Sequence, residues 1–260
     1  MITKLKFALL LFILIFSSCS CTRINFNVKP KEFEGPRLHK STIPTETFLK
    51  FETHLVSPTE SKVVSSCSAF SAKHSRKGTI GVTNFHCVDT NPMVAMELMF
   101  SKDTKLIYKV KLPTNETFKV KVLKKDPRTD LASFIIEDIY LTVAQVSKNE
   151  PAVSEEIWII GTPVGWEQFD DHFETVPIIR GLFNGRVKIG RLGNTVGYLY
   201  SARIAPGSSG SPVFVKRNNT YQVVGVIHSV VALNSGRLGL FQEFCMGTSL
   251  RDLQSFLSNT

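Results

Sequence analysis

The segment Ala205-Pro206-Gly207-Ser208-Ser209-Gly210-Ser211-Pro212-Val213 separates two runs of strand-forming residues and decides how the rest of the chain is interpreted. Glycines on both sides of Ser209 let the backbone turn sharply, expose a hydroxyl and aim consecutive N–H groups at one point. A site that holds a developing oxyanion needs this arrangement. A flexible Gly/Ser turn is the plain alternative, and Ser208 and Ser211 are rival nucleophiles within the same segment.

A reactive serine needs a base and a group that orients the base, and the sequence offers one candidate for each. A neutral imidazole takes the proton of the serine, and a buried carboxylate fixes the tautomer of that imidazole. His86 lies at the end of a β-rich run, and Asp130 comes directly before an apolar run. Considered separately, each residue has a simpler interpretation: His86 as a structural residue and Asp130 as part of a turn. Together with Ser209 they form a candidate triad.

Short apolar runs separated by Gly, Pro, Asn and Asp indicate strands, in two groups divided by the polar interval 147–156. Helical periodicity occurs near the C-terminus, where Thr248 or Ser249 can cap a helix over 250–257. Two groups of about six strands indicate two small packed β-barrels, although a single sandwich with extra strands fits the same pattern. The predicted strands cover residues 62–70, 79–84, 105–112, 118–123 and 131–136, then 157–160, 185–190, 196–204, 212–215, 221–227 and 240–247.

The composition agrees with a globular, all-β protein. Hydrophobic residues make up 43% and charged residues 20% of the 260 residues, which excludes a disordered or fibrous chain. The content of 16 Gly, 12 Pro and 19 Phe favours strands over a helical bundle. A formal net charge of +9 attracts anionic surfaces or acidic substrates. The basic residues are scattered and form no aromatic-and-basic module, so we expect no specific nucleic-acid binding.

The first residues are typical of an exported protein. Lys4 and Lys6 precede an apolar run over 7–16, and small residues follow it, which is the layout of a secretory signal. The apolar run is too short to cross a hydrocarbon core of about 30 Å as a helix. We therefore expect a periplasmic, extracellular or lipid-anchored protein.

Small residues directly before Cys19 are similar to a bacterial lipobox, in which the cysteine is acylated after cleavage. Membrane attachment through a lipidated Cys19 is thus one expectation, and simple cleavage near Cys21 is the other. We expect a signal over 1–20 and an extended arm over 21–57, because the arm is polar, rich in proline and without sustained periodicity.

Taken together, the motifs resemble the chymotrypsin-fold serine peptidases, and they are most similar to HtrA/Deg-like and other bacterial trypsin-like peptidases. They follow the family order of His, Asp and Ser. Two further phrases resemble the turn that opens the second barrel and the strand that lines the specificity pocket. The matching segments are Thr83-Asn84-Phe85-His86, Asp130-Leu131-Ala132, Gly207-Ser208-Ser209-Gly210-Ser211-Pro212, Ile157-Trp158-Ile159-Ile160-Gly161-Thr162-Pro163-Val164-Gly165 and Val223-Val224-Gly225-Val226.

This resemblance implies a peptidase domain over 58–260. Its fold would be two packed six-stranded antiparallel β-barrels, at about 58–146 and 156–248, followed by a short helix at about 249–258. HtrA proteins also append a peptide-binding PDZ domain. We expect none here, because few residues follow Thr248.

The resemblance also assigns roles to the candidate residues. Ser209 would attack an amide carbonyl, His86 would act as its base, and Asp130 would orient His86. The N–H groups of Gly207 and Ser209 would form the oxyanion hole. Neither a metal nor an organic cofactor is expected, and the substrate is a protein or peptide.

Two residues depart from the family pattern. Ser208 stands where many animal enzymes have an aspartate that pairs with a new N-terminus, so that route of activation is not expected. Ser211 replaces a glycine, which bears on the local backbone more than on the chemistry.

The resemblance further implies a disulfide between Cys67 and Cys87, because animal members of the family join cysteines at matching places, one of them beside the catalytic histidine. Cys245 is left over, and we expect it to be a buried core thiol.

Specificity depends on the pocket strand, where we expect His228, Ser229 and Val230 to line the substrate pocket. Glutamate-selective relatives use a histidine of this strand to bind a substrate carboxylate, but theirs lies two positions after the glycine. His228 lies three positions after Gly225, so glutamate preference and an ordinary core or rim histidine both remain open. The rival functions are a non-catalytic binding protein on the same fold and a serine esterase.

Overall fold

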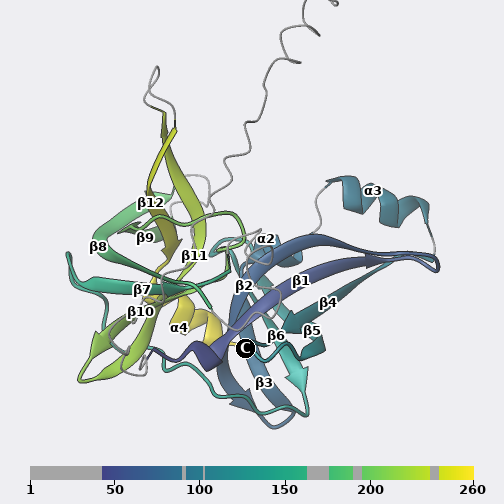
Figure 1. Cartoon of the computed structure of the whole chain (residues 1–260), viewed down its shortest axis with the longest axis horizontal. Coiled ribbons are helices and arrows are strands. Elements are labelled where there is room, and N and C mark those ends of the chain that lie inside the picture. Colours follow the sequence, from purple (N-terminus) through teal and green to yellow (C-terminus); the bar gives the residue numbers. More distant parts are fainter. Residues whose placement is uncertain (1–42, 90–91, 102, 163–175, 190–194, 235–239) are drawn as a thin grey trace, which may run out of the picture. The chain divides into compact units, whose positions relative to one another are not determined.

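The structure, a computed structural model, describes residues 43–89, 92–101, 103–162, 176–189, 195–234 and 240–260 (Figure 1). The predicted signal, Cys19, Cys21 and the Pro163-Val164-Gly165 part of the turn phrase lie outside the described residues. Among the described residues, no helix combines the length and apolar character that a membrane span requires. The described elements, in chain order, are η1 (Thr45–Thr47), β1 (Phe48–Val56), β2 (Ser61–Ser75), β3 (Gly78–Thr83), α2 (Phe85–Val88), α3 (Pro92–Phe100), β4 (Lys105–Lys111), β5 (Thr117–Asp126), β6 (Leu131–Glu137), β7 (Glu156–Ile160), β8 (Ile178–Ile189), β9 (Thr195–Ser201), β10 (Pro212–Arg217), β11 (Thr220–Asn234), β12 (Leu240–Thr248) and α4 (Leu250–Ser258).

The strands close into two antiparallel barrels, which confirms the predicted fold and excludes the single sandwich. The first barrel has the strand order β1-β2-β3-β6-β5-β4, and the second has the order β7-β8-β9-β12-β11-β10 when read from its first strand. The two orders are the same six-strand pattern used twice. Both barrels belong to one unit of the chain, Ser41–Thr260.

Alternation along the strands explains why each barrel has its own core. In β5, residues alternate between exposed and half-buried along the whole strand, with Val120 and Val122 packed against the first core and lysines on the other face. The core of the second barrel includes the fully buried rings of Tyr198 and Tyr200. Each barrel therefore buries one face of its strands independently.

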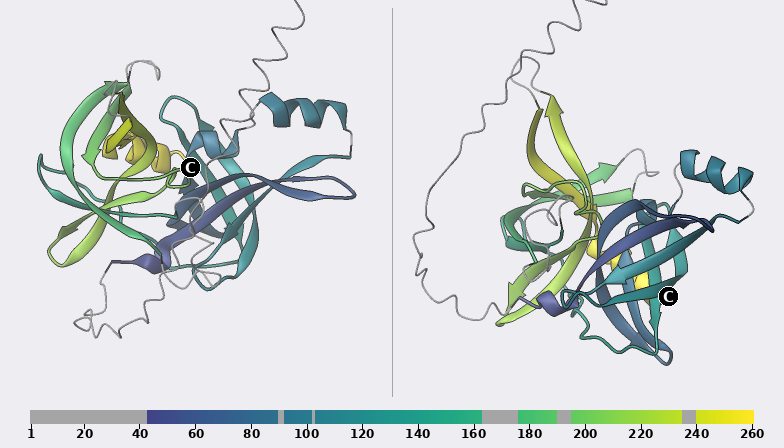
Figure 2. Two further views of the ribbon diagram at one scale, coloured as in Figure 1. Left: turned by 45° about the horizontal axis from the view of Figure 1, so that its top comes forward. Right: turned by 45° about the vertical axis from the view of Figure 1, so that its right-hand side comes forward.

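A third apolar cluster joins the barrels. It combines Phe70 and Leu131 of the first barrel with Phe214 and Val226 of the second and with the buried face of α4. Figure 1 and Figure 2 show α4 lying between the two barrels. The facing strands and the apolar face of α4 thus fix the barrels against each other, and this sets the geometry of any site between them.

The predicted C-terminal helix is confirmed with its cap. Ser249 Oγ accepts a hydrogen bond from the N–H of Asp252 at 3.2 Å, as expected of an N-cap serine. At the other end, Lys73 and Lys124 of the first barrel donate to the carbonyls of Leu257 and Phe256, at 2.5 Å and 3.3 Å. Cations at a helix C-terminus complement its dipole, so α4 is anchored to the first barrel by charge as well as by apolar contact.

The structure corrects the predicted extent of the N-terminal arm. Residues 48–56 do not belong to an extended arm, because they form β1, which pairs with β2 on one side and β4 on the other. Leu49, Phe51 and Leu55 alternate with more polar residues and are buried. The first barrel therefore begins about ten residues earlier than the predicted boundary, since Phe48 replaces residue 58 as its start.

Helix α3 was not predicted from the sequence. The helix carries apolar residues on every face and has no amphipathic period, so neither the strand pattern nor the helix pattern signals it.

Candidate active site

His86 lies in α2, the single helical turn that follows β3. The ring is well exposed, with 45% of the side-chain surface accessible. Its backbone is fixed by contacts of the two residues that precede it. The side chain of Asn84 donates to the carbonyl of Asp130 at 2.8 Å, and the N–H of Phe85 donates to the same carbonyl at 3.1 Å.

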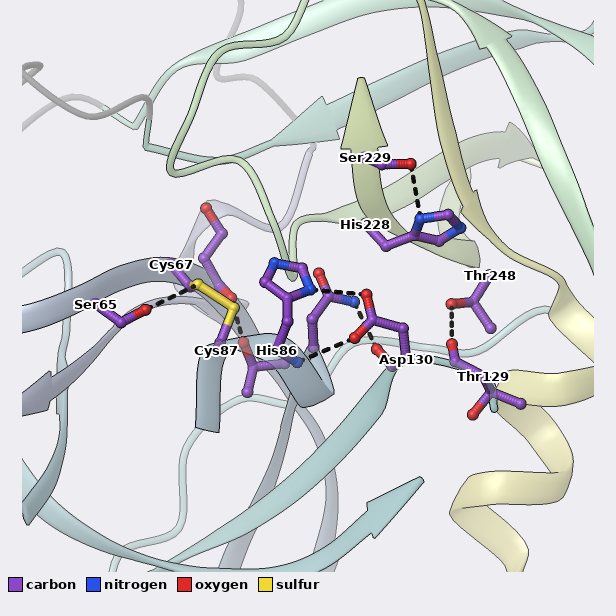
Figure 3. Close-up of polar contacts among 12 residues, drawn as sticks. Ser65, Cys67, His86, Cys87, Thr129, Asp130, His228, Ser229 and Thr248 are labelled. Atoms are coloured by element: carbon purple, nitrogen blue, oxygen red, sulfur yellow. Dashed lines mark hydrogen bonds and ion pairs between the residues drawn. A yellow bond between two sulfur atoms is a disulfide. The ribbon is translucent and has the colours of Figure 1, made fainter. Parts of the chain in front are cut away.

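Asp130 binds His86 twice, as Figure 3 shows. One carboxylate oxygen accepts from the backbone N–H of His86 at 3.0 Å, and the other lies 2.8 Å from the ring atom Nδ1. Asp130 itself has φ of 53°, a left-handed conformation that aspartate tolerates better than most residues. The paired contacts fix the direction of the imidazole, and a proton on Nδ1 leaves Nε2 free to accept one.

Both barrels position the loop that carries Asp130. Thr248, at the end of β12, donates its hydroxyl to the carbonyl of Thr129 at 3.0 Å. Thr195 of β9 donates to the carbonyl of Arg128 at 3.1 Å. The orientation of the carboxylate therefore depends on the second barrel as well as on the first.

The Gly/Ser turn leaves two N–H groups without an acceptor. Gly207 and Gly210 have φ of 93° and 87°, which only glycine adopts without strain. The N–H groups of Ser208, Gly210 and Ser211 all donate to backbone carbonyls. Among the described residues, those of Gly207 and Ser209 have no such partner, so they are available to bind an oxyanion.

Exposure selects one of the three serines in this turn. Ser208 and Ser211 have no accessible surface, and their hydroxyls are buried without a hydrogen-bond partner in the described part of the chain. Ser209 is half-buried, so a substrate can reach it. The two rival nucleophiles are therefore inaccessible in this structure.

Ser209 is tied to the first barrel by its backbone. Its carbonyl accepts from the N–H of Ser68 at 2.7 Å, and the Ser68 hydroxyl donates to the carbonyl of Gly207 at 2.9 Å. No hydrogen bond joins the side chains of Ser209 and His86, two residues that the structure describes. In unliganded sites such bonds are often long and shorten when substrate binds.

A disulfide next to these residues confirms the predicted pair. Cys67 and Cys87 are bonded and buried. Cys87 directly follows His86, and Cys67 directly precedes Ser68, so the bond links the backbone that carries His86 to the strand that holds the serine turn. The two sulfurs lie within 4.8 Å of a ring nitrogen of His86, but in the disulfide they are not thiolate ligands for a metal.

Cys245 is the free cysteine of the described residues, and it is buried as predicted. Burial raises the pKa of its thiol to about 12, so it remains protonated and unreactive at neutral pH.

The structure places His228 beside the pair formed by His86 and Asp130 (Figure 3). It is 9% exposed, and its Nδ1 shares a hydrogen bond of 2.9 Å with Ser229 Oγ. Ser229 is half-buried, and Val230 packs against the core of the second barrel.

A β-bulge sets the position of His228 in β11. Ile227 and Ser229 pair with consecutive residues of β12, so His228 is the extra residue of the bulge. Simple alternation along the strand therefore does not decide which way this ring points.

We expect His228 to make the fold sensitive to acid. Burial lowers its pKa, Asp130 opposes that effect, and His86 adds to it. Because the folded pKa is below the unfolded value, His228 contributes stability that is complete above about pH 6.5 and is lost as the pH falls further. His228→Gln should flatten the decline in unfolding free energy below about pH 6.5, measured by urea denaturation. His74→Gln, at an exposed histidine of β2, is the control; equal slopes for His228→Gln and wild type would contradict the expectation.

Sequence motifs located His86, Asp130 and Ser209 but not the residues that hold them. Asn84 belongs to the Thr83-Asn84-Phe85-His86 motif, which assigns it no role. In the structure its side chain donates a hydrogen bond to the carbonyl of Asp130. Ser68 and Thr248 contact residues more than one hundred positions away, so no local pattern reveals them.

Two closed six-stranded barrels, a His-Asp pair and a glycine-flanked serine turn define the class of chymotrypsin-fold peptidases. Residues 66–226 match the family model of the trypsin-like peptidase domain. The match covers more than half of the chain, which therefore belongs to the trypsin-like peptidase family. No curated protein matches the chain at a significant level.

Proposed function

We propose that this protein is a serine endopeptidase that uses His86, Asp130 and Ser209 as a triad. The observation that carries the proposal is the paired contact of Asp130 with His86, at 2.8 Å to the ring and 3.0 Å to the backbone. The Ser209 turn supports it, because this turn combines one accessible hydroxyl with two N–H groups that lack backbone acceptors. Membership of the trypsin-like peptidase family indicates a peptide or protein as the substrate.

The reaction follows from the roles of these groups. Ser209 Oγ attacks the carbonyl carbon of a peptide bond while His86 accepts its proton, and Asp130 stabilises the imidazolium that forms. The carbonyl oxygen becomes an oxyanion that accepts from the N–H groups of Gly207 and Ser209. Such a donor typically lowers the barrier by about 2.7 to 4 kcal/mol. His86 then returns the proton to the leaving amine, and water hydrolyses the acyl-enzyme by the same steps in reverse.

We propose further that the protein works outside the cytoplasm. The buried disulfide supports this, because disulfides persist in oxidising compartments and are rare in the cytosol. The signal-like residues before Cys19 agree with export, either as a cleaved secreted protein or as one anchored by a lipid.

A fluorophosphonate probe tests the proposal directly. We expect the probe to label the wild-type protein and casein to be cleaved, and we expect Ser209→Ala to abolish both. Ser255→Ala, at an exposed serine of α4, is the matched control and should be labelled like the wild type. A folded wild type that is neither labelled nor active on casein would be a binding protein. Labelling with ester hydrolysis but no peptide cleavage would indicate an esterase.

A further inference from the structure

Helix α3 presents apolar side chains to solvent. Met96, Met99 and Phe100 are 58%, 82% and 83% exposed, whereas Val94 is buried at 7%. Glu97 is the single charged residue in the helix. Figure 1 and Figure 2 show α3 beside the far ends of β1 and β2. A helix that is apolar on all faces and yet exposed marks a surface that binds something.

Two hollows lie between α3 and the start of β2. The first has a volume of about 370 Å³, and its lining includes His86. The second has a volume of about 450 Å³ and is lined by Lys62, Val63, Val64, Val94, Met96, Glu97 and Phe100. Val64 and Val94 line both hollows. The hollows therefore adjoin each other at Val64 and Val94, and together we call them the α3 groove, which begins at His86 and becomes more apolar along the helix.

The chemistry of His86 decides which part of a substrate this groove would receive. His86 protonates the leaving amine, so the leaving half of the chain must depart on the side of the imidazole. The lining of the groove comes from β1, β2 and the segment around α2 and α3, all within the first barrel. The Ser209 turn, which keeps the acyl half, precedes β10 of the second barrel.

We propose that the α3 groove binds the part of a polypeptide substrate that follows the cleaved bond and selects apolar side chains there. This inference rests on the proposed peptidase function. From Val94 to Phe100 the helix rises by about 9 Å, at about 1.5 Å per residue. An extended peptide covers that length with about three residues, at about 3.3 Å each. The stretch of helix beside the second hollow thus accommodates about three residues of the peptide after the cut, and these contact Val64, Met96 and Phe100.

Cleavage of a proteome-derived peptide library by the full chain tests this proposal, because mass spectrometry of the products identifies the residues on both sides of each cut. We expect wild type to favour Leu, Ile, Val, Phe or Met within the first few positions after the cut. Met96→Ser combined with Phe100→Ser should remove that preference and lower kcat/KM for the best apolar peptide about tenfold, a change of about 1.4 kcal/mol. Both side chains are exposed, so the fold should persist. Met99→Ser is the matched control, since Met99 is as exposed as Phe100 but does not line the groove.

The rate of fluorophosphonate labelling separates failure of this proposal from failure of the proposed function. The probe carries no polypeptide after the reacting bond, so the double variant should be labelled at the wild-type rate. A wild type without labelling would overturn the peptidase function itself. A labelled double variant that keeps the wild-type cleavage profile would overturn only the groove. The groove proposal would also be overturned if the substitutions changed self-association or vesicle binding and left cleavage unaltered. The groove would then bind another copy of the protein or a membrane instead of substrate.

Discussion

Asp130→Asn is expected to lower kcat about ten-thousandfold while leaving the protein folded. The carboxylate holds the Nδ1 side of the imidazole, and in the proposed mechanism this leaves Nε2 as the proton acceptor. An amide that donates to Nδ1 would favour the wrong tautomer and would not stabilise the imidazolium. The measurement is kcat on a cleaved peptide, together with circular dichroism to confirm folding.

The backbone around Asp130 makes this substitution a test of charge and not of structure. Asn84 and Phe85 both donate to the backbone carbonyl of residue 130, and the substitution does not alter that group. Asparagine also tolerates the left-handed conformation that Asp130 adopts. Asp126→Asn is the matched control, because Asp126 ends β5, directly before the loop that carries Asp130, and contacts Arg128 instead of His86. A kcat for Asp130→Asn within a few fold of that control would contradict the assigned role.

The predicted parts of the fold were those that leave a local pattern. Strands such as β5 alternate strictly, and α4 has both its apolar face and its cap within ten residues. The triad candidates were found because each lies in a short motif whose residue types the chemistry requires. These features depend on neighbours in the sequence, so the sequence alone contains them.

The missed parts depend on contacts between distant segments. β1 lies between proline-containing stretches, and although its apolar residues alternate with more polar ones, its pairing with β2 and β4 is what identifies it as a strand of the barrel. The bulge at His228 arises from the register between β11 and β12, which no single strand determines. Ser68 acts through Gly207, a residue 139 positions away, so its role appears only once the barrels are packed.

Reduction of the disulfide is expected to destabilise the fold by about 3 kcal/mol and to lower the melting temperature by about 6 to 12 °C. The bond between Cys67 and Cys87 closes a loop of 20 residues in sequence separation, which limits the conformational entropy of the unfolded chain. Thermal unfolding with and without reductant measures the effect. Cys67→Ala combined with Cys87→Ala should reproduce it without reductant.

The position of the bond predicts that activity is lost before the barrels unfold. Cys87 adjoins His86, and Cys67 adjoins Ser68, whose N–H holds the carbonyl of Ser209 at 2.7 Å. Breaking the bond should therefore loosen His86 and the serine turn relative to each other, so the reduced protein should lose the proposed peptidase activity at temperatures where circular dichroism still shows it folded. Cys245→Ala is the control, because Cys245 forms no disulfide; this variant should respond to reductant as the wild type does. Equal melting temperatures for the oxidised and reduced wild type would contradict the predicted stabilisation, and activity that declines only with unfolding would contradict the link to the site.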